Sequence, residues 1–145
     1  MAQKKQNVLF LCTGNSCRSQ MGEAILRQLA GDRFRCFSAG TDPHPIHPLT
    51  VQVLDEMGID ISGARSKDIT EYLGKEQFRY VIIVCDRASR SCPRIFPGMN
   101  ERVEMFFEDP VAFEGTEEET LAKFRETRDK IRARLQAWLA SLPEE

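Results

Sequence analysis

The sequence predicts an α/β fold: a single-domain, doubly wound, four-stranded parallel sheet with helices on both faces. Short apolar segments alternate along the chain with segments of helical periodicity, so successive strands need crossover connections, which favour a parallel sheet. A chain of 145 residues has the length of one domain and buries about 70% of its unfolded surface. No repeat, low-complexity tract or linker divides the sequence, so we treat residues 1–145 as one domain.

The strands are predicted from short runs of apolar residues that end in polar turns. The runs NVLFL and YVIIV are almost continuously apolar, as expected of strands that are buried on both faces. The run FRCFS alternates between polar and apolar residues, and RVEMFF is the fourth candidate. The predicted strands are therefore Asn7–Leu11, Phe34–Ser38, Tyr80–Val84 and Arg102–Phe107.

The helices are predicted from apolar residues at helical spacing and from residues that favour helix ends. Pro48 suits a first helical turn, Gly58 a C-terminal stop, and Ser66 an N-cap. Thr116 and Glu119 form a capping-box pattern. The predicted helices run from Ser19 to near Gly31, from Pro48 to about Met57, from Lys67 to Leu73, and from behind Thr116 to the C-terminus.

The bulk composition argues against several classes of protein. A net charge of −2 and a pI near 5.8 give no reason to expect nucleic acid as a partner. The longest apolar runs, such as Tyr80–Cys85, are too short to cross a bilayer. No long apolar stretch follows the basic start MAQKKQN, as one would in a signal peptide. We therefore expect a cytoplasmic protein that does not associate with membranes, and a monomer by default.

The chain has five cysteines, an odd number, which argues against a disulfide-stapled secreted domain. In a reducing cytosol such thiols stay free unless they are metal ligands, catalytic groups or redox-active groups. Cys36 lies in a strand pattern and is expected in the core. Cys17 is either a structural thiol or a partner of Cys12 in a protective disulfide. The other two cysteines are Cys85 and Cys92.

The segment between the first predicted strand and the first predicted helix has the chemistry of an anion site. Cys12 and Arg18 bracket five residues in a C-x5-R spacing. The helix N-terminus carries unsatisfied N–H groups and a partial positive charge, and Gly14 and Asn15 tolerate the positive φ of a tight loop. Arg18 adds a planar fork of donors for an oxyanion. In that field we expect a Cys12 thiolate that acts as a nucleophile at neutral pH.

Other interpretations of these residues stay open at this point. The segment lacks the Walker pattern G-x-x-x-x-G-K-[ST], and no second cysteine pair or histidine at matching spacing completes a metal site. A plain strand-to-helix turn with inert thiols is the structural alternative, and a non-catalytic oxyanion or redox sensor would carry the same thiols. Taken alone, Asp109 before Pro110 is typical of an ordinary turn, and Cys85 and Cys92 are an incidental pair.

The loop C-T-G-N-S-C-R-S after a buried strand resembles the anion loop of the low-molecular-weight protein tyrosine phosphatase superfamily. Its continuation Gln20-Met21 is similar to that of the thioredoxin-coupled arsenate reductases, whereas the phosphatases usually have proline after the serine. The similarity continues through SAGT at residues 38–41, GIDIS at residues 58–62, the strand that ends at Cys85, and the pair Asp109-Pro110. It covers most of the chain and implies a low-molecular-weight phosphatase-like fold.

The resemblance also implies a mechanism. Cys12 attacks arsenate while Asp109, as general acid, protonates the departing oxygen. Cys85 then attacks Cys12 and releases arsenite, and Cys92 attacks Cys85, which leaves a Cys85–Cys92 disulfide for thioredoxin to reduce. Asn15 and Ser19 support the loop and the thiolate by hydrogen bonds. The oxyanion is held by Thr13, Gly14, Asn15, Ser16, Cys17, Arg18 and Ser19.

The spacing of the two downstream cysteines requires a change in backbone conformation. If the segment from Cys85 to Cys92 were helical, their Cα atoms would lie about 10 Å apart along the axis. A disulfide needs them within roughly 7 Å. Formation of the bond therefore requires this segment to unwind, for which its polar sequence DRASRS is suited.

The main alternative function is that of a phosphatase that hydrolyses phosphate monoesters through a Cys12 phosphoenzyme, with Cys85 and Cys92 as bystanders. The phosphatases often carry tyrosines after Asp-Pro, and the sequence DPVAFEG has none, which favours the reductase.

No cofactor is expected, although some family members bind a potassium ion beside the loop. Asn15, Glu23 and Ser38 resemble three of its ligands, but Lys67 stands at the fourth, acidic position, so we predict that its ammonium group replaces the ion. No metal site is expected at the H-x-x-H pair of residues 44 and 47, because prolines interrupt that loop.

Overall fold

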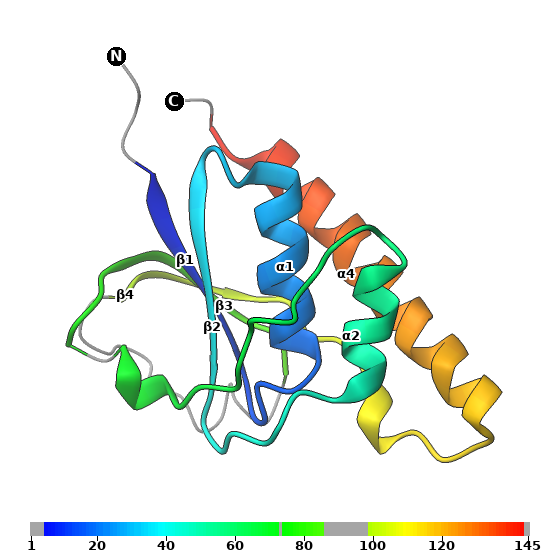
Figure 1. Ribbon diagram of the computed structural model, residues 1–145. Helices are drawn as coiled ribbons and strands as arrows, with labels where there is room; N and C mark the ends of the chain where they lie inside the picture. Colours follow the sequence, from blue (N-terminus) through cyan, green and yellow to red (C-terminus); the bar gives the residue numbers. More distant parts are fainter. Residues whose placement is uncertain (1–4, 73, 86–98, 144–145) are drawn as a thin grey trace.

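A single parallel sheet of four strands forms the centre of the computed structural model, which describes residues 5–72, 74–85 and 99–143 (Figure 1). The strands follow the order β2-β1-β3-β4, and all three pairings are parallel. This arrangement confirms the predicted fold class. The strands are β1 (Gln6–Cys12), β2 (Phe34–Gly40), β3 (Phe78–Ile83) and β4 (Met99–Glu104).

Three α-helices pack against one another on one side of the sheet, at the right in Figure 1. Trp138 near the end of the last helix stacks on Phe34 of β2, with ring centroids 5.9 Å apart. Because side chains alternate between the faces of a strand, Phe37 points to the opposite face. There Tyr72 meets it edge-on at 5.5 Å. The α-helices among the described residues are α1 (Arg18–Ala30), α2 (Pro48–Asp55) and α4 (Glu117–Ser141).

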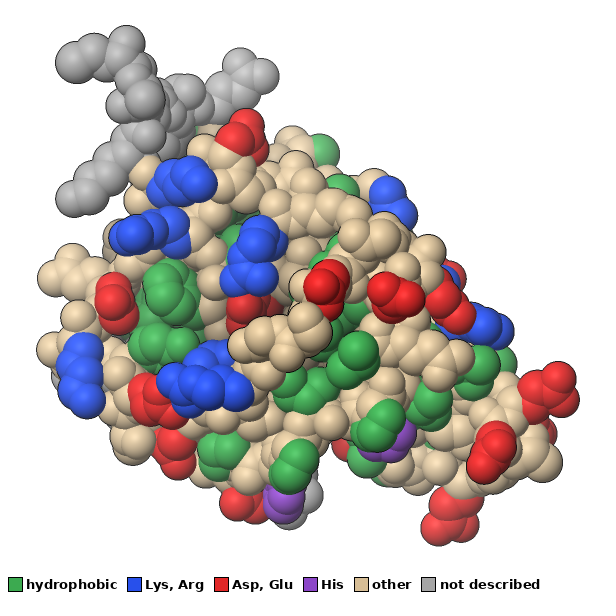
Figure 2. All heavy atoms as spheres, in the orientation of Figure 1, with side chains coloured by type: hydrophobic (Ala, Val, Ile, Leu, Met, Phe, Trp, Pro, Cys, Tyr) green, Lys and Arg blue, Asp and Glu red, His purple; other side chains and the backbone are tan. Residues whose placement is uncertain are grey.

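The last helix begins with the predicted capping box. The Thr116 side chain accepts a hydrogen bond from the Glu119 backbone N–H, and the Glu119 carboxylate accepts one from the Thr116 N–H. Acidic side chains gather over this end of α4, at the lower right in Figure 2, where the helix dipole favours negative charge. Among the described residues, no helix is both long and apolar enough to cross a membrane.

The predicted helix from Lys67 to Leu73 is wrong. In the described part of this range, residues 67–72, only a 3-10 turn forms, η1 (Ile69–Glu71). The Ser66 hydroxyl is instead directed at the backbone carbonyl oxygens of Asn15 and His44, and the Asp68 side chain caps the turn by accepting from the Thr70 N–H. A tertiary contact with the Cys12–Arg18 loop therefore overrides the local helix signal.

The fourth strand begins three residues before its predicted start, because its register is set by pairing with β3, where Phe78 lies opposite Met99. The chain still runs beside β3 after the strand ends: the Met105 N–H donates to the Ile83 carbonyl, and the Phe107 N–H donates to the Val84 carbonyl. This continuation brings the next residues, including Asp109, to the carboxyl edge of the sheet, where β1 ends at Cys12.

Candidate active site

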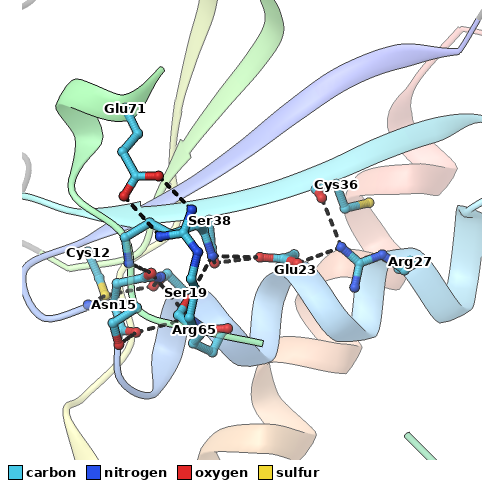
Figure 3. Close-up of polar contacts among 12 residues, drawn as sticks. Cys12, Asn15, Ser19, Glu23, Arg27, Cys36, Ser38, Arg65 and Glu71 are labelled. Atoms are coloured by element: carbon cyan, nitrogen blue, oxygen red, sulfur yellow. Dashed lines mark hydrogen bonds and ion pairs between the residues drawn. The ribbon is translucent and has the colours of Figure 1, made fainter. Parts of the chain in front are cut away.

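The loop that joins β1 to α1 is wrapped around the sulfur of Cys12 (Figure 3). The Asn15 backbone N–H donates to Cys12 Sγ at 3.1 Å, and Ser19 Oγ lies 2.8 Å from the same sulfur. Asn15 Nδ2 donates to Ser19 Oγ at 2.8 Å, which orients the hydroxyl. Asn15 has φ of 49°, as the loop sequence predicted for a residue that tolerates the left-handed region.

The loop's carbonyl groups are taken up by the chain that follows β2. The N–H groups of Thr41, Asp42, His44 and His47 donate to the carbonyls of Cys12, Thr13, Gly14 and Ser16, at 2.8–3.2 Å. In a planar trans peptide the N–H points away from the carbonyl of the preceding residue. The Asn15 N–H, which follows the Gly14 carbonyl, is accordingly directed at Cys12 Sγ, as a backbone donor at an oxyanion site would be.

The approach of these two segments depends on Gly40. A Cβ atom there would lie 2.5 Å from the Thr13 carbonyl oxygen and 3.0 Å from the Asn15 nitrogen. Only glycine allows the end of β2 to come this close to the loop.

A cleft of about 480 Å³ opens over the loop. Its floor is made by loop residues that include the predicted set Thr13, Gly14, Ser16, Cys17 and Arg18, together with Cys12. The segment from Asp42 to His47 and the pair Asp109 and Val111 form its rim. Two residues predicted to bind the substrate, Asn15 and Ser19, are fully buried behind the floor, where they make hydrogen bonds to each other and to Cys12.

Arg18 and Asp109 meet at this cleft. Arg18 Nη1 donates to the Phe107 carbonyl at 2.9 Å, and Nη2 lies 3.4 Å from Asp109 Oδ2. The other carboxylate oxygen of Asp109 accepts from the Val111 N–H at 3.0 Å, which caps the 3-10 turn η2 (Pro110–Ala112). The Asp109 side chain is 38% exposed, so its carboxyl group is accessible from the cleft. Asp109, the predicted general acid, and Arg18, the predicted anion-binding cation, therefore lie side by side in the cleft.

Burial raises the pKa of the Cys12 thiol, whereas the hydrogen bonds with Ser19 and Asn15 and the charge of Arg18 lower it. The net direction is upward, which corrects our expectation that the loop's field favours the thiolate. The physical reason is that the sulfur is almost completely buried and the Arg18 guanidinium is directed to Phe107 and Asp109. In this geometry Ser19 and Asn15 are the groups that make ionisation accessible.

The remaining cysteines separate into two kinds. Burial raises the pKa of Cys17 and that of Cys36 to about 12, so both are poor nucleophiles, and Cys36 lies in the core as predicted. Cys85 follows β3, and its sulfur lies 3.3 Å from Thr13 Oγ1 in the loop. A second thiol is thus held beside the anion site. Cys92 lies outside the described residues.

The residues that resemble a potassium site, Glu23 and Ser38, form an ion cluster with Lys67 behind the loop. Ser38 Oγ donates to Glu23 Oε1 at 2.5 Å, and Lys67 Nζ lies 3.8 Å from the same oxygen and 3.5 Å from Ser38 Oγ. The Lys67 backbone N–H donates to Asn15 Oδ1 at 2.8 Å. Figure 3 shows Glu23 reaching Ser38 on one side and Arg27 on the other.

The two histidines have local partners. His44 Nε2 lies 3.4 Å from Asp42 Oδ2 at the cleft rim. His47 Nδ1 accepts from the Leu49 N–H at 3.1 Å and so caps α2. In the part of the chain that the structure describes, no three histidine, cysteine or acidic side chains form a group that could hold a metal ion.

Two residues at the site were not found from the sequence. Gln20, in the first turn of α1, donates to both oxygens of Asn15, and Ser66 donates to the Asn15 carbonyl. In the sequence, Gln20 is only a point of resemblance to the arsenate reductases. The feature that would identify Gln20 is the burial of its amide beside the anion loop, and a single sequence does not reveal burial.

The family model for low molecular weight phosphotyrosine protein phosphatase matches residues 7–145, so the chain belongs to this family. Among curated relatives, an arsenate reductase of Halalkalibacterium halodurans is 41% identical over 134 residues, which are 92% of this chain and 95% of the relative.

Solved structures of two functional types resemble the chain. An arsenate reductase in the phosphate-binding state has a TM-score of 0.75 at 27% identity, and it covers 95% of this chain and 99% of its own. A low molecular weight protein tyrosine phosphatase from T. tengcongensis has a TM-score of 0.74 at 27% identity. The match covers 95% of this chain and 100% of the phosphatase. A thioredoxin-dependent arsenate reductase from Corynebacterium glutamicum has a TM-score of 0.65 at 28% identity. The match covers 98% of this chain and 66% of the reductase.

Proposed function

We propose that this member of the low molecular weight phosphotyrosine protein phosphatase family reduces arsenate to arsenite through a relay of Cys12, Cys85 and Cys92. The observation that carries the proposal is the position of Cys85, whose sulfur lies 3.3 Å from a hydroxyl of the anion loop. Phosphate hydrolysis needs one thiol, an acid and an anion loop, and it gives no role to a second thiol at that place. The names of the curated relatives support the same reaction.

The first step uses the loop, Cys12 and Asp109. The Cys12 thiolate attacks arsenic(V), and an As–S bond forms. One arsenate oxygen leaves as water, with a proton from the Asp109 carboxyl, which lies at the cleft rim. The loop N–H groups and Arg18 hold the remaining oxygens. To do so, the guanidinium exchanges its contact with Asp109 for the substrate.

The second step is the reduction itself. The Cys85 thiolate attacks Cys12 Sγ, an S–S bond forms, and the electron pair of the As–S bond stays on arsenic, which leaves as arsenite. Thr13 Oγ1 beside the Cys85 sulfur supplies a hydrogen bond that orients this thiol toward the loop. Two thiols lose two electrons in total, and arsenic gains two.

The third step returns Cys12 to its starting state. Cys92 attacks Cys85 Sγ, a Cys85–Cys92 disulfide forms, and the Cys12 thiolate leaves. We propose thioredoxin as the dithiol that reduces this disulfide. The structural similarity to a thioredoxin-dependent arsenate reductase supports this reductant.

The test is consumption of NADPH with arsenate, thioredoxin and thioredoxin reductase, measured beside hydrolysis of a chromogenic aryl phosphate. Arsenate-dependent turnover should be lost in Cys12→Ser, Cys85→Ser and Cys92→Ser. Cys36→Ser is the matched control, since this buried cysteine lies on β2 away from the loop and should keep its turnover.

The alternative is hydrolysis of phosphate monoesters, which the similarity to a tyrosine phosphatase structure favours. It predicts aryl phosphate hydrolysis that depends on Cys12 and Asp109 but not on Cys85 or Cys92. Fast hydrolysis of this kind without arsenate turnover would replace the reductase proposal.

We further propose that the enzyme needs no potassium ion. Lys67 Nζ lies within 3.8 Å of Glu23 and 3.5 Å of Ser38, so an ammonium group already provides the positive charge behind the loop. Arsenate turnover should be equal in potassium and sodium chloride at the same ionic strength. A strong rise with potassium alone would contradict the proposal.

A further inference from the structure

Gln20 is a buried polar side chain whose role the mechanism above leaves open. It is 2% exposed, and its amide nitrogen lies 3.1 Å from the Asn15 carbonyl oxygen, 3.1 Å from Asn15 Oδ1 and 3.0 Å from the Arg65 carbonyl oxygen. An amide NH2 has two hydrogens. One is therefore shared between the two Asn15 oxygens and the other goes to Arg65. Both N–H hydrogens of the Gln20 side chain are therefore used to connect the loop at Asn15 to the segment at Arg65.

Asn15 is the residue that these bonds fix. Among the described residues it is the one residue other than glycine with positive φ. A residue in this region stays there when its surroundings hold it. Its carbonyl accepts from Gln20 and Ser66, and its side-chain oxygen accepts from Gln20 and the Lys67 N–H.

The conformation of Asn15 in turn sets the environment of the reacting sulfur. Its backbone N–H donates to Cys12 Sγ at 3.1 Å. Its side-chain nitrogen donates to Ser19 Oγ, which lies 2.8 Å from that sulfur. If Asn15 rotates out of the left-handed region, both contacts are lost together.

We propose that Gln20 is a positioning residue that sets the reactivity of Cys12 through Asn15. It holds Asn15 in the conformation that directs one N–H at the sulfur and orients Ser19 for the second hydrogen bond. The inference rests on the proposed role of Cys12 as the nucleophile, but it can be tested without arsenate.

Several charged or titratable groups face Cys12, and the Gln20 amide donates to none of their side chains. Behind the loop lie Lys67 and Glu23, and Cys85 lies beside Thr13. The groups that share the cleft with Cys12 are Cys17, Arg18, Asp42, His44, His47 and Asp109. A shift in the pH profile of Cys12 after a change at Gln20 therefore reports on Asn15 and Ser19.

The experiment compares Gln20→Met with Gln28→Met. Gln28 lies on the same helix, and its amide donates to the Met57 carbonyl at 3.3 Å, so both variants lose glutamine hydrogen bonds but only one loses those to the loop. The rate of Cys12 alkylation by iodoacetamide is followed against pH on the reduced protein, with the modified peptide identified by mass spectrometry.

In Gln20→Met the midpoint of the pH profile should rise by about one unit, so that alkylation below the midpoint slows roughly tenfold, as expected for the loss of about one hydrogen bond to the thiolate. Gln28→Met should keep the wild-type profile. A wild-type midpoint in Gln20→Met, at any thermal stability, would show that Gln20 is merely structural and overturn the inference.

A second variant covers the case in which Gln20→Met does not fold. Gln20→Asn keeps the amide but is one methylene shorter, so it cannot reach both Asn15 and Arg65. An upward shift in its midpoint supports the proposal, and an unchanged midpoint overturns it. If the midpoint shifts but arsenate turnover is absent even in the wild type, the proposed function has failed and the positioning role stands.

Discussion

The two sides of the Cys12–Arg18 loop are built differently. The inner side, formed by Asn15, Ser19 and Gln20, is almost fully buried, and its polar side chains are engaged in short hydrogen bonds. On the outer side, the cleft rim, Asp109 is 38% exposed and its contact with Arg18 is 3.4 Å long. Cys12, the proposed nucleophile, is thus enclosed by buried hydrogen bonds, whereas Arg18 and Asp109, the groups proposed to hold the anion and to move the proton, meet in a longer and more exposed contact.

This difference predicts how substitutions on the two sides will behave. Changes on the outer side that keep the positive charge at position 18, which lowers the pKa of Cys12, should reduce the rate of the chemical step strongly and leave the pH profile of Cys12 in place. Changes on the inner side should move the pH profile of Cys12 and reduce the rate less.

The largest effect is expected for Arg18→Lys on the outer side. A lysine keeps the charge but lacks the planar fork that holds two oxygens, so kcat/KM for arsenate should fall about a thousandfold, as for loss of an oxyanion donor. The measurement is the coupled NADPH assay over a range of arsenate concentrations. A fall of less than about tenfold would show that the backbone N–H groups hold the anion by themselves.

Asp109→Asn should reduce kcat about a hundredfold, because the amide cannot give a proton to the departing oxygen. Glu108→Gln is the matched control, since this neighbouring carboxylate does not line the cleft. Single-turnover arsenate reduction checks the step directly. An unchanged single-turnover rate would remove Asp109 from the mechanism.

On the inner side, Ser19→Ala should reduce turnover at neutral pH about tenfold, since one hydrogen bond to the sulfur is lost. That bond lowers the pKa of Cys12, so its loss raises the pKa further, and the rate should recover as the pH is raised. The pH dependence of turnover, or of Cys12 alkylation, measures this shift. A downward shift would contradict the assignment.

The smallest effect is expected behind the loop. Lys67→Ala removes the ammonium group from Glu23 and Ser38, so the free energy of unfolding should fall by about 1–2 kcal/mol. Lys75→Ala, at an exposed position, is the control and should change stability little. Urea unfolding of both variants gives the comparison. A Lys67→Ala protein as stable as the wild type would show that the cluster does not need this cation.

The outer features could be predicted from the sequence because their signals are local. The C-x5-R spacing after the apolar run of β1 predicted the loop, and the parallel topology predicted that Cys85 and Asp109 would lie at the same sheet edge. The structure places both residues there, with Cys85 beside Thr13 and Asp109 beside Arg18.

The inner side could be predicted only in part. The resemblance implied that Asn15 and Ser19 support the Cys12 thiolate by hydrogen bonds, and both bonds are present in the structure. Its other features depend on contacts between distant segments. The local sequence suggested that Ser66 caps a helix, but its side chain is directed at the loop and Asp68 caps the turn that forms there. The pKa of Cys12 is raised by burial, which no spacing reveals. Gln20 was identified only by resemblance, although it holds three backbone and side-chain oxygens.

The most direct test of the account is a single turnover by the Cys92→Ala variant. With arsenate and no external reductant, it should release about one equivalent of arsenite and stop as a Cys12–Cys85 disulfide, which peptide mapping identifies. Wild-type protein treated in the same way should instead hold a Cys85–Cys92 disulfide. Arsenite release without a Cys12–Cys85 bond, or no arsenite at all, would contradict the assignment of Cys85 as the second thiol of the relay.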